Sequence, residues 1–315
     1  MGKRLKIGLI DVDGHHYPNI PLMKISAWHK NHGDSVEWYQ PLLSGHCDKV
    51  YMSKVFSFTP DYQYFIDADE IVNGGSGYCI EMQGGKEIYH AERDNPLPEE
   101  IEHTYPDYSL YPEQTKDTAY GFLTRGCPRG CSFCHVAVKE GKCSRKVANL
   151  SEFWGGQRNI VLCDPNILAC PEHIELLEQL AESGAKVDFN QGLDIRLITE
   201  KNLDVIKRIK LKSVHFAFDR WQDKNIIEPR LRKFKVATGF DRHKVSVYIL
   251  MNFDTTIEQD LYRIQLCREL GFRPYPMIYD KEHCDKIYKQ IQRWCNPCIF
   301  WKIERFEDYR GELNT

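Results

Sequence analysis

Short apolar runs alternate with stretches of helical periodicity in the first part of the chain. Three of these runs have the length of buried strands, at 5–11, 35–41 and 49–56. After the first run, Pro18 suits the first turn of a helix that continues to about His32. Strands alternating with helices predict a small parallel, doubly wound layer that extends to the glycine-rich turn NGGSGY at 73–78.

The same alternation returns after residues 91–118, which are rich in Pro, Asp, Glu and Tyr, have no clear period and are typical of a linker. Six further strands are expected, at 121–126, 159–164, 186–191, 213–218, 244–250 and 273–279. Helix signals lie between them: Pro171 and Gly184 bound one helix, Thr199 caps another, and a helix with a capping box at Thr256 ends at Gly271. Units of this length predict an incomplete parallel barrel, with its chemistry at the carboxyl ends of the strands.

The predicted fold class is therefore α/β, with a small Rossmann-like N-terminal domain, a partial (β/α)6 barrel and a short C-terminal extension. We place the N-terminal domain and its linker at 1–112, the barrel at 113–280 and the extension at 281–315.

Composition narrows the possible environments and partners. The formal net charge of −3 over 315 residues provides no overall basic field for non-specific binding to nucleic acid. The chain contains no run of roughly 18 apolar residues, so no membrane span is expected. Its first apolar stretch, Ile7 to Ile10, is too short for a signal peptide. Twelve cysteines without an export signal indicate a reducing compartment, and we expect a cytoplasmic protein with metal-bound or buried thiols.

The segment Cys127-Pro-Arg-Gly-Cys131-Ser-Phe-Cys134 concentrates three cysteines in one short loop. At this cysteine content, the spacing is expected by chance only about 0.02 times per chain. Three thiolates can hold three irons of a [4Fe–4S] cubane and leave the fourth iron open, as a catalytic centre requires. Gly126 and Gly130 would let the loop wrap closely around a cluster.

Three other interpretations of this loop compete. Cys131-Ser-Phe-Cys134-His135 also matches the attachment motif of a c-type haem, which requires an exported protein. A zinc site could combine the three thiolates with His135 or Cys143. The cysteines could also be buried thiols without a metal. The cluster is favoured because the loop follows a strand that opens a series of βα units, where barrel enzymes place their active sites.

The C-x3-C-x2-C spacing, with an aromatic residue before the last cysteine, resembles the radical S-adenosylmethionine superfamily over residues 118–280. In that superfamily the open iron binds the amino and carboxylate groups of S-adenosylmethionine. One electron then cleaves the sulfonium into methionine and a 5′-deoxyadenosyl radical. The resemblance implies that Phe133 lies near the adenine, and that an electron donor such as flavodoxin or ferredoxin serves the cluster.

Polar residues at the expected strand ends suit the rest of this cofactor. Asp164 and Asn166 follow the second barrel strand and could accept from the methionine ammonium, or form an Asx-type turn. The superfamily often has a Gly-Gly-Glu-like segment here, whereas this chain has Cys-Asp-Pro-Asn. Asp219 follows the fourth strand as a ribose ligand or a loop cap, and Met251 with Asn252 would flank the adenine at the end of the fifth.

The third strand ends in Gln191-Gly-Leu-Asp194-Ile-Arg196, which is similar to a segment common in superfamily barrels that carry an N-terminal cobalamin-type domain. The resemblance implies that Gln191, Asp194 and Arg196 contribute to cofactor binding. Asp194 and Arg196 would bind the ribose or the carboxylate, because arginine presents a planar fork to carboxylates. A mutual structural ion pair is the alternative.

The first 90 residues resemble the cobalamin-binding fold. Its Asp-x-His-x-x-Gly motif corresponds to Asp13-Gly-His15-His16-Tyr-Pro18, in which proline stands where the motif has glycine. The turn NGGSGY would admit a nucleotide tail or form a tight strand-to-helix turn. Cobalamin is therefore a possible second cofactor, and Asp13, His15 and His16 are candidates for contact with a cofactor or substrate.

Two further groups of residues leave their roles open. His283, Cys284, Cys295 and Cys298 could hold an auxiliary iron–sulfur cluster or zinc, or could be reduced thiols without a metal. Basic stretches at 207–212 and 230–235 are typical of solvated helix faces, with a nucleic-acid substrate as the alternative.

The sequence thus predicts a radical S-adenosylmethionine enzyme that abstracts hydrogen from a substrate whose class the pattern does not indicate. A cobalamin-dependent radical methyltransferase and a zinc-stabilised binding protein are the alternatives.

Overall fold

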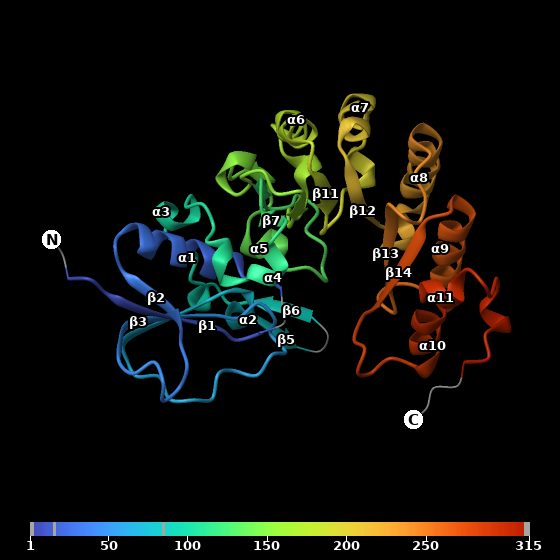
Figure 1. The fold of residues 1–315 in the computed structure, drawn as a ribbon. Coiled ribbons are helices and arrows are strands. Elements are labelled where there is room, and N and C mark those ends of the chain that lie inside the picture. The colour runs from blue at the N-terminus through green and yellow to red at the C-terminus, as the bar shows by residue number, and fades with distance from the viewer. Residues whose placement is uncertain (1–2, 15–16, 84–85, 312–315) are drawn as a thin grey trace. The chain divides into compact units, whose positions relative to one another are not determined.

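The computed structural model describes residues 3–14, 17–83 and 86–311 of an α/β protein (Figure 1). It has a four-stranded sheet of order β2-β1-β3-β4 and a six-stranded sheet of order β14-β13-β12-β11-β10-β7, both parallel. The α/β class expected from the alternating pattern is confirmed. The chain divides into two compact units, Met1–Val161 and Leu162–Thr315. The predicted domain boundaries at 112 and 280 stay predictions.

The four-stranded sheet consists of β1 (Lys6–Asp11), β2 (Ser35–Trp38), β3 (Cys47–Ser53) and β4 (Ala68–Gly74). Helix α1 (Ile20–Asn31) connects β1 to β2. The helix begins beyond Pro18, because the Asn19 side chain accepts a hydrogen bond from the Leu22 N–H (3.1 Å) and caps the first turn. The expected strands at 5–11, 35–41 and 49–56 are confirmed, with shifted ends.

The core beneath α1 includes a residue from the segment predicted to be a linker. Ile7 and Leu9 of β1 pack with Leu22 of α1 and with Ile101, which is 4% exposed and belongs to the short helix α3 (Glu99–Glu102). The Tyr111 hydroxyl also donates to the Asp11 carboxylate (2.8 Å). Residues 91–118 are therefore part of the first unit rather than a free linker, because Ile101 and Tyr111 are buried within it.

Beyond β4 the first unit continues through α2 (Ser76–Cys79) into an antiparallel hairpin of β5 (Ile80–Gln83) and β6 (Lys86–Tyr89). The residue pattern did not predict this hairpin, because each of its strands is only four residues long. Two more short helices complete the unit, α4 (Pro112–Thr115) and α5 (Val136–Lys139), with 3-10 turns at Ala91–Arg93, Tyr108–Leu110 and Leu150–Glu152.

Five of the six strands expected for the barrel occur in the larger sheet, as β10 (Asn159–Leu162), β11 (Lys186–Phe189), β12 (Leu211–Ala217), β13 (Val245–Met251) and β14 (Arg273–Ile278). The strand expected at 121–126 is displaced. The sheet instead contains β7 (Thr118–Gly121), whereas β8 (Thr124–Arg125) pairs antiparallel with β9 (Arg145–Lys146). The Phe153 ring fills the space beside Gly121, only 2.4 Å from where a Cβ would lie.

Helices α6 (His173–Ser183), α7 (Glu200–Arg208), α8 (Lys224–Thr238) and α9 (Ile257–Leu270) lie on one side of strands β11–β14 (Figure 1). The predicted helix ends are confirmed: Gly184 and Gly271 have left-handed φ values of 65°. Thr199 and Thr256 accept from the backbone at the predicted starts. The first of these helices begins at His173, two residues beyond Pro171.

The C-terminal segment is folded. It comprises α10 (Lys286–Trp294), α11 (Pro297–Phe300), a 3-10 turn at Phe306–Asp308 and two buried aromatic residues, Trp294 (2% exposed) and Phe300 (0%). The remaining 3-10 turns are Ile167–Ala169, Ile195–Leu197 and Trp221–Asp223. Within the residues described, every helix is too short or too polar to cross a membrane.

Candidate functional site

The three-cysteine loop lies between β8 and α5, in the first unit. Cys127, Cys131 and Cys134 are partly exposed. Six other thiols are buried, those of Cys47, Cys79, Cys163, Cys170, Cys267 and Cys295. The loop thus combines clustered cysteines with access to solvent, which a reactive or metal-binding thiol needs and a packing thiol does not.

Backbone hydrogen bonds and two glycines shape this loop. The Cys127 N–H donates to the Gly141 carbonyl (3.1 Å), and the Cys134 N–H donates to the Cys131 carbonyl (3.1 Å). Gly126 has φ 88°, and a Cβ there would lie 2.2 Å from the Cys143 carbonyl oxygen. Glycine is therefore required at 126 both by its backbone angle and by the close approach of a second segment.

A carboxylate stabilises the start of the loop. The Glu140 side chain accepts from the Gly126 N–H (3.1 Å) and from the Arg125 guanidinium (3.0 Å). Arg125 also lies over the Phe122 ring, 3.4 Å from its centre. Contacts among Glu140, Arg125 and Phe122 therefore hold the segment that enters the cysteine loop in place.

The thiol of Cys134 is electrostatically coupled to its neighbours. Burial raises the pKa of Cys134 to about 11, and the charges of Glu87, Cys131 and Cys127 act in the same direction. A thiolate at this position would need a compensating positive charge nearby.

The described side chains form no ready-made site for a single metal ion. No three His, Cys, Asp or Glu side chains converge on one metal position within 3–14, 17–83 and 86–311. A mononuclear site needs such convergence, whereas a cubane binds each thiolate to a different iron, so that the sulfurs surround the cluster. Cys127, Cys131 and Cys134 are partly exposed on one short loop, and the cluster stays a prediction.

A glutamate from the hairpin holds the end of the loop. Glu87 on β6 accepts from both the backbone N–H and the Nδ1 of His135, the residue that follows Cys134. Burial raises the pKa of Glu87, but the hydrogen bonds and charge of His135 outweigh it and lower the pKa overall. The carboxylate is therefore ionised beside the cysteine loop. Neither Glu87 nor His135 was predicted as part of the site in this way.

The predicted residues of the second unit lie at or just after strand ends. Asp164 and Asn166 are both 3% exposed and follow β10, with Asn166 preceding a 3-10 turn. Met251, the last residue of β13, is completely buried. Asn252 has a positive φ of 62°, and its amide donates to the Tyr279 carbonyl. Gln191 is exposed and follows β11.

Phe133, which belongs to the first unit, is half-buried within the cysteine loop.

Asp194 and Arg196 form the ion pair that the sequence left open as an alternative. Arg196 Nε lies 2.7 Å from Asp194 Oδ1, and Arg196 Nη1 lies 2.9 Å from Asp223 Oδ2. Asp194 also accepts from the Arg196 N–H (3.1 Å) and caps a 3-10 turn. Two carboxylates therefore orient the guanidinium, and any binding role for Arg196 starts from this fixed geometry.

Asp219, another of the predicted residues, has a buried carboxyl group with a raised pKa. Its side chain accepts from the Leu250 N–H (3.0 Å) on the neighbouring strand. Burial raises the pKa of Asp219 to about 6, although that hydrogen bond and the charges of Arg263 and Arg196 oppose the change. A carboxyl group at a strand end that titrates near neutrality is suited to proton transfer.

Asp219→Asn is expected to stabilise the protein at neutral pH and to have no such effect in acid. The pKa of Asp219 is about 6 in the folded protein, whereas an ordinary aspartate has a pKa of 3.8. The folded state therefore loses stability as the pH rises from 3.8 to about 6, because the unfolded chain releases this proton more readily. The variant removes this cost, and its free energy of unfolding in urea should exceed that of the wild type by up to about 3 kcal/mol at pH 8. The difference should vanish near pH 4.

Asp204→Asn, at an exposed carboxylate of α7, is the matched control and should follow the wild type at both pH values. An Asp219→Asn effect of equal size at pH 4 and pH 8 would contradict the assigned burial cost.

Strands β11, β12 and β13 carry a polar chain that the sequence analysis missed. His215 Nδ1 hydrogen-bonds to Ser246 Oγ, and His215 Nε2 lies 3.7 Å from Asp188 Oδ1. The Tyr248 ring stacks on His215 at 4.9 Å between ring centres. The signal was present in the alternation: polar Asp188 and His215 stand between buried apolar neighbours, which indicates a strand face that helices do not cover.

In the N-terminal layer, Asp13 of the predicted cobalamin-type motif has a structural role. Asp13 accepts from the backbone of Val55 and Phe56 and from the Thr59 hydroxyl (2.7 Å), so it shapes the loop after β3. His15 and His16 lie outside the described residues.

The glycine-rich turn is filled by the chain itself. A Cβ at Gly75 would lie 2.3 Å from the Lys54 carbonyl oxygen, and one at Gly77 would lie 2.7 Å from the Lys54 side chain. Residues 73–78 therefore form the strand-to-helix turn that was the alternative to a nucleotide-binding loop. The cobalamin hypothesis itself stays untested.

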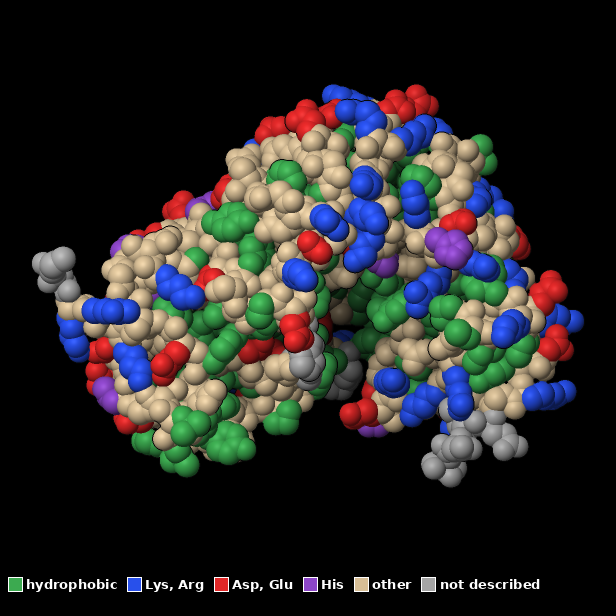
Figure 2. All heavy atoms as spheres, viewed as in Figure 1, with side chains coloured by type: hydrophobic (Ala, Val, Ile, Leu, Met, Phe, Trp, Pro, Cys, Tyr) green, Lys and Arg blue, Asp and Glu red, His purple; other side chains and the backbone are tan. Residues whose placement is uncertain are grey.

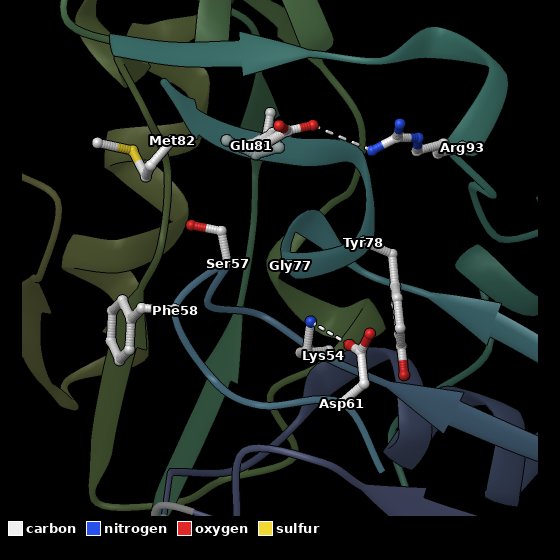
Figure 3. A pocket seen from close by; sticks show the side chains of 10 residues that line it. Lys54, Ser57, Phe58, Asp61, Gly77, Tyr78, Glu81, Met82 and Arg93 are labelled. Carbon is white, nitrogen blue, oxygen red and sulfur yellow. Dashed lines mark hydrogen bonds and ion pairs between the residues drawn. The ribbon is translucent and has the colours of Figure 1, made fainter. Parts of the chain in front are cut away.

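Next to this turn is a cavity of about 380 Å³ (Figure 3). Its charged groups are already paired, since Lys54 contacts Asp61 and Arg93 contacts Glu81 (3.3 Å). The Tyr78 hydroxyl is buried and has no hydrogen-bond partner among the described residues, and burial raises the pKa of Tyr78 to about 12. Paired charges of both signs give the cavity no preference for one class of ligand.

The tail cysteines do not share one environment. Cys295 is buried and its pKa is raised by that burial, whereas Cys298 is exposed. His283 is bonded to Asp280 (2.7 Å). The second metal centre stays a prediction.

The basic stretches are accompanied by acidic residues. Arg208 pairs with Glu178, and Arg232 pairs with both Glu228 (2.9 Å) and Glu269 (3.0 Å). On the face seen in Figure 2, acidic and basic side chains are mixed along the edge formed by α6 and α7. These contacts favour solvated helix faces, the default interpretation of the pattern.

No family model matches the chain, and no curated protein matches it.

Proposed function

We propose that the protein is a radical S-adenosylmethionine enzyme whose [4Fe–4S] cluster is held by Cys127, Cys131 and Cys134. The observation that carries this proposal is the loop between β8 and α5, where three partly exposed thiols share one short segment bounded by Gly126 in a left-handed conformation. The open iron would bind S-adenosylmethionine, and one electron from the cluster would generate the 5′-deoxyadenosyl radical. A reduced flavodoxin or ferredoxin would supply that electron.

In this proposal the remaining residues bind and orient the substrate and cofactor. Asp164, Asp194 and Asp219 follow strands β10, β11 and β12 of one parallel sheet, whose carboxyl ends share an edge. A partial barrel is the finer fold we propose for this sheet. Arg196, oriented by Asp194 and Asp223, would recognise a carboxylate or ribose of the cofactor. Asp219 would hold or release a proton near neutral pH.

The test is reconstitution with iron and sulfide in the absence of oxygen. The purified chain should bind about four irons and four sulfides and, after reduction with S-adenosylmethionine present, release 5′-deoxyadenosine. An intact cluster that yields no 5′-deoxyadenosine would contradict the enzymatic proposal. Stoichiometric zinc without sulfide would favour the zinc-stabilised binding protein, and a corrinoid spectrum in the purified protein would favour the cobalamin-dependent methyltransferase.

A further inference from the structure

The hairpin of β5 and β6 contacts the segment that follows the third cysteine of the loop, through Glu87 on β6. Glu87 Oε2 accepts from the His135 backbone N–H at 3.0 Å and from His135 Nδ1 at 2.7 Å. Because a carboxylate only accepts, Nδ1 carries the proton in this contact. One oxygen thus fixes both the backbone and the ring of the residue adjacent to Cys134.

His135 precedes the short helix α5, and a second contact holds the other end of that helix. Lys139, the last residue of α5, donates to Asp94 Oδ1 at 2.6 Å and approaches the Cys79 sulfur at 3.4 Å. The Tyr89 hydroxyl at the end of β6 donates to the other oxygen of Asp94 (3.0 Å). Residues 135–139 are therefore held at both ends by charged groups that lie on or beside the hairpin.

The two contacts differ in their distance from the cysteines. Asp94 binds at the far end of α5, whereas Glu87 binds one residue from Cys134 along the chain. The side chains of Glu87 and His135 are 30% and 27% exposed, so water screens this carboxylate only in part. A partly desolvated negative charge acts strongly on the charge of a nearby group.

We propose that Glu87 is a positioning residue for the cluster, which orients the Cys134 end of the loop through His135 and keeps the reduction potential of the cluster low. This inference rests on the proposed function. Reduction adds a negative charge to the cluster, and a fixed carboxylate nearby disfavours that charge. Partners beyond the metal ligands commonly control both the orientation of a site and its retention of metal.

The test compares reconstituted Glu87→Gln with the wild type and with Glu81→Gln on the same hairpin. Glu81 pairs with Arg93 rather than with His135. Glu81→Gln therefore removes one carboxylate from the same hairpin without changing the contact to His135. The midpoint potential, measured by titration monitored with electron paramagnetic resonance, should shift to more positive values in Glu87→Gln alone. Loss of iron to a chelator should be roughly tenfold faster in that variant.

A potential in Glu87→Gln that is unchanged, or more negative, would overturn the inference. Glu87→Asp provides a second measurement if the glutamine variant does not fold: it keeps the charge but shortens the reach. Its potential should stay near that of the wild type while iron loss accelerates, and wild-type rates of iron loss in this variant would overturn the positioning role. Failure of the proposed function has a different signature, since the wild type itself would then bind no iron and sulfide.

Discussion

Replacement of Cys127, Cys131 or Cys134 by alanine is expected to abolish both cluster assembly and production of 5′-deoxyadenosine. Each thiolate of the proposed cubane binds its own iron, so losing one exposes a second iron and makes the cluster labile. The three changes should therefore give the same complete loss rather than graded effects. Iron and sulfide analysis after oxygen-free reconstitution, together with chromatographic detection of 5′-deoxyadenosine, provides the measurement.

Two other cysteines serve as controls. Cys298→Ala removes an exposed thiol of the C-terminal segment and should leave iron content unchanged. Cys143 has an exposed thiol, and its backbone carbonyl lies against Gly126. Cys143→Ala removes that thiol and distinguishes a cluster held by three cysteines from a zinc site. Metal loss in Cys143→Ala would support a zinc site with Cys143 as fourth ligand. Full iron retention in all three loop variants would contradict the cluster assignment.

Asp260→Ala is expected to lower the free energy of unfolding by about 3–5 kcal/mol. Asp260 and Arg263 of α9 form an ion pair in which both side chains are 0% exposed. Removing the carboxylate leaves a buried guanidinium without its counter-charge, and an unpaired buried charge is among the costliest defects in a protein. Urea unfolding followed by circular dichroism measures the loss.

This ion pair also supports the predicted site. The Arg263 guanidinium donates to the carbonyl of Leu250 (2.8 Å) near the end of β13 and to that of Phe218, the residue before Asp219. Asp260→Ala should therefore loosen both strand ends. Glu258→Ala, an exposed change in the first turn of the same helix, is the control and should cost less than about 1 kcal/mol. A similarly small loss in Asp260→Ala would show that the buried pair is not needed for stability.

Local signals predicted most of the fold because they depend on neighbouring residues alone. Caps such as Thr199 and Thr256, and left-handed glycines such as Gly184, act through backbone groups only a few residues away. Apolar runs likewise marked five of the strands in the larger sheet, since a strand buried on one or both faces shows its burial in its own residues.

The errors arose where distant parts of the chain compete for the same segment. The strand expected at 121–126 is divided, because Thr124 and Arg125 pair with Arg145 and Lys146 instead of continuing the sheet. The supposed linker contributes Ile101 to a core more than seventy residues away along the chain, beside Leu22. No local period could reveal either partner, because both depend on long-range pairing.

The cysteine spacing by itself determined that three thiols share one short loop, since eight residues of chain cannot carry them far apart. Only the tertiary structure decided what surrounds that loop: Glu87 arrives from a hairpin 48 residues from His135, and Glu140 folds back onto Gly126. It also decided that Arg196 is held by Asp223 as well as Asp194 and that burial raises the pKa of Asp219. Ligand spacing is a property of the covalent chain, whereas charge, burial and hydrogen bonding at a site come from segments that meet only when the chain folds.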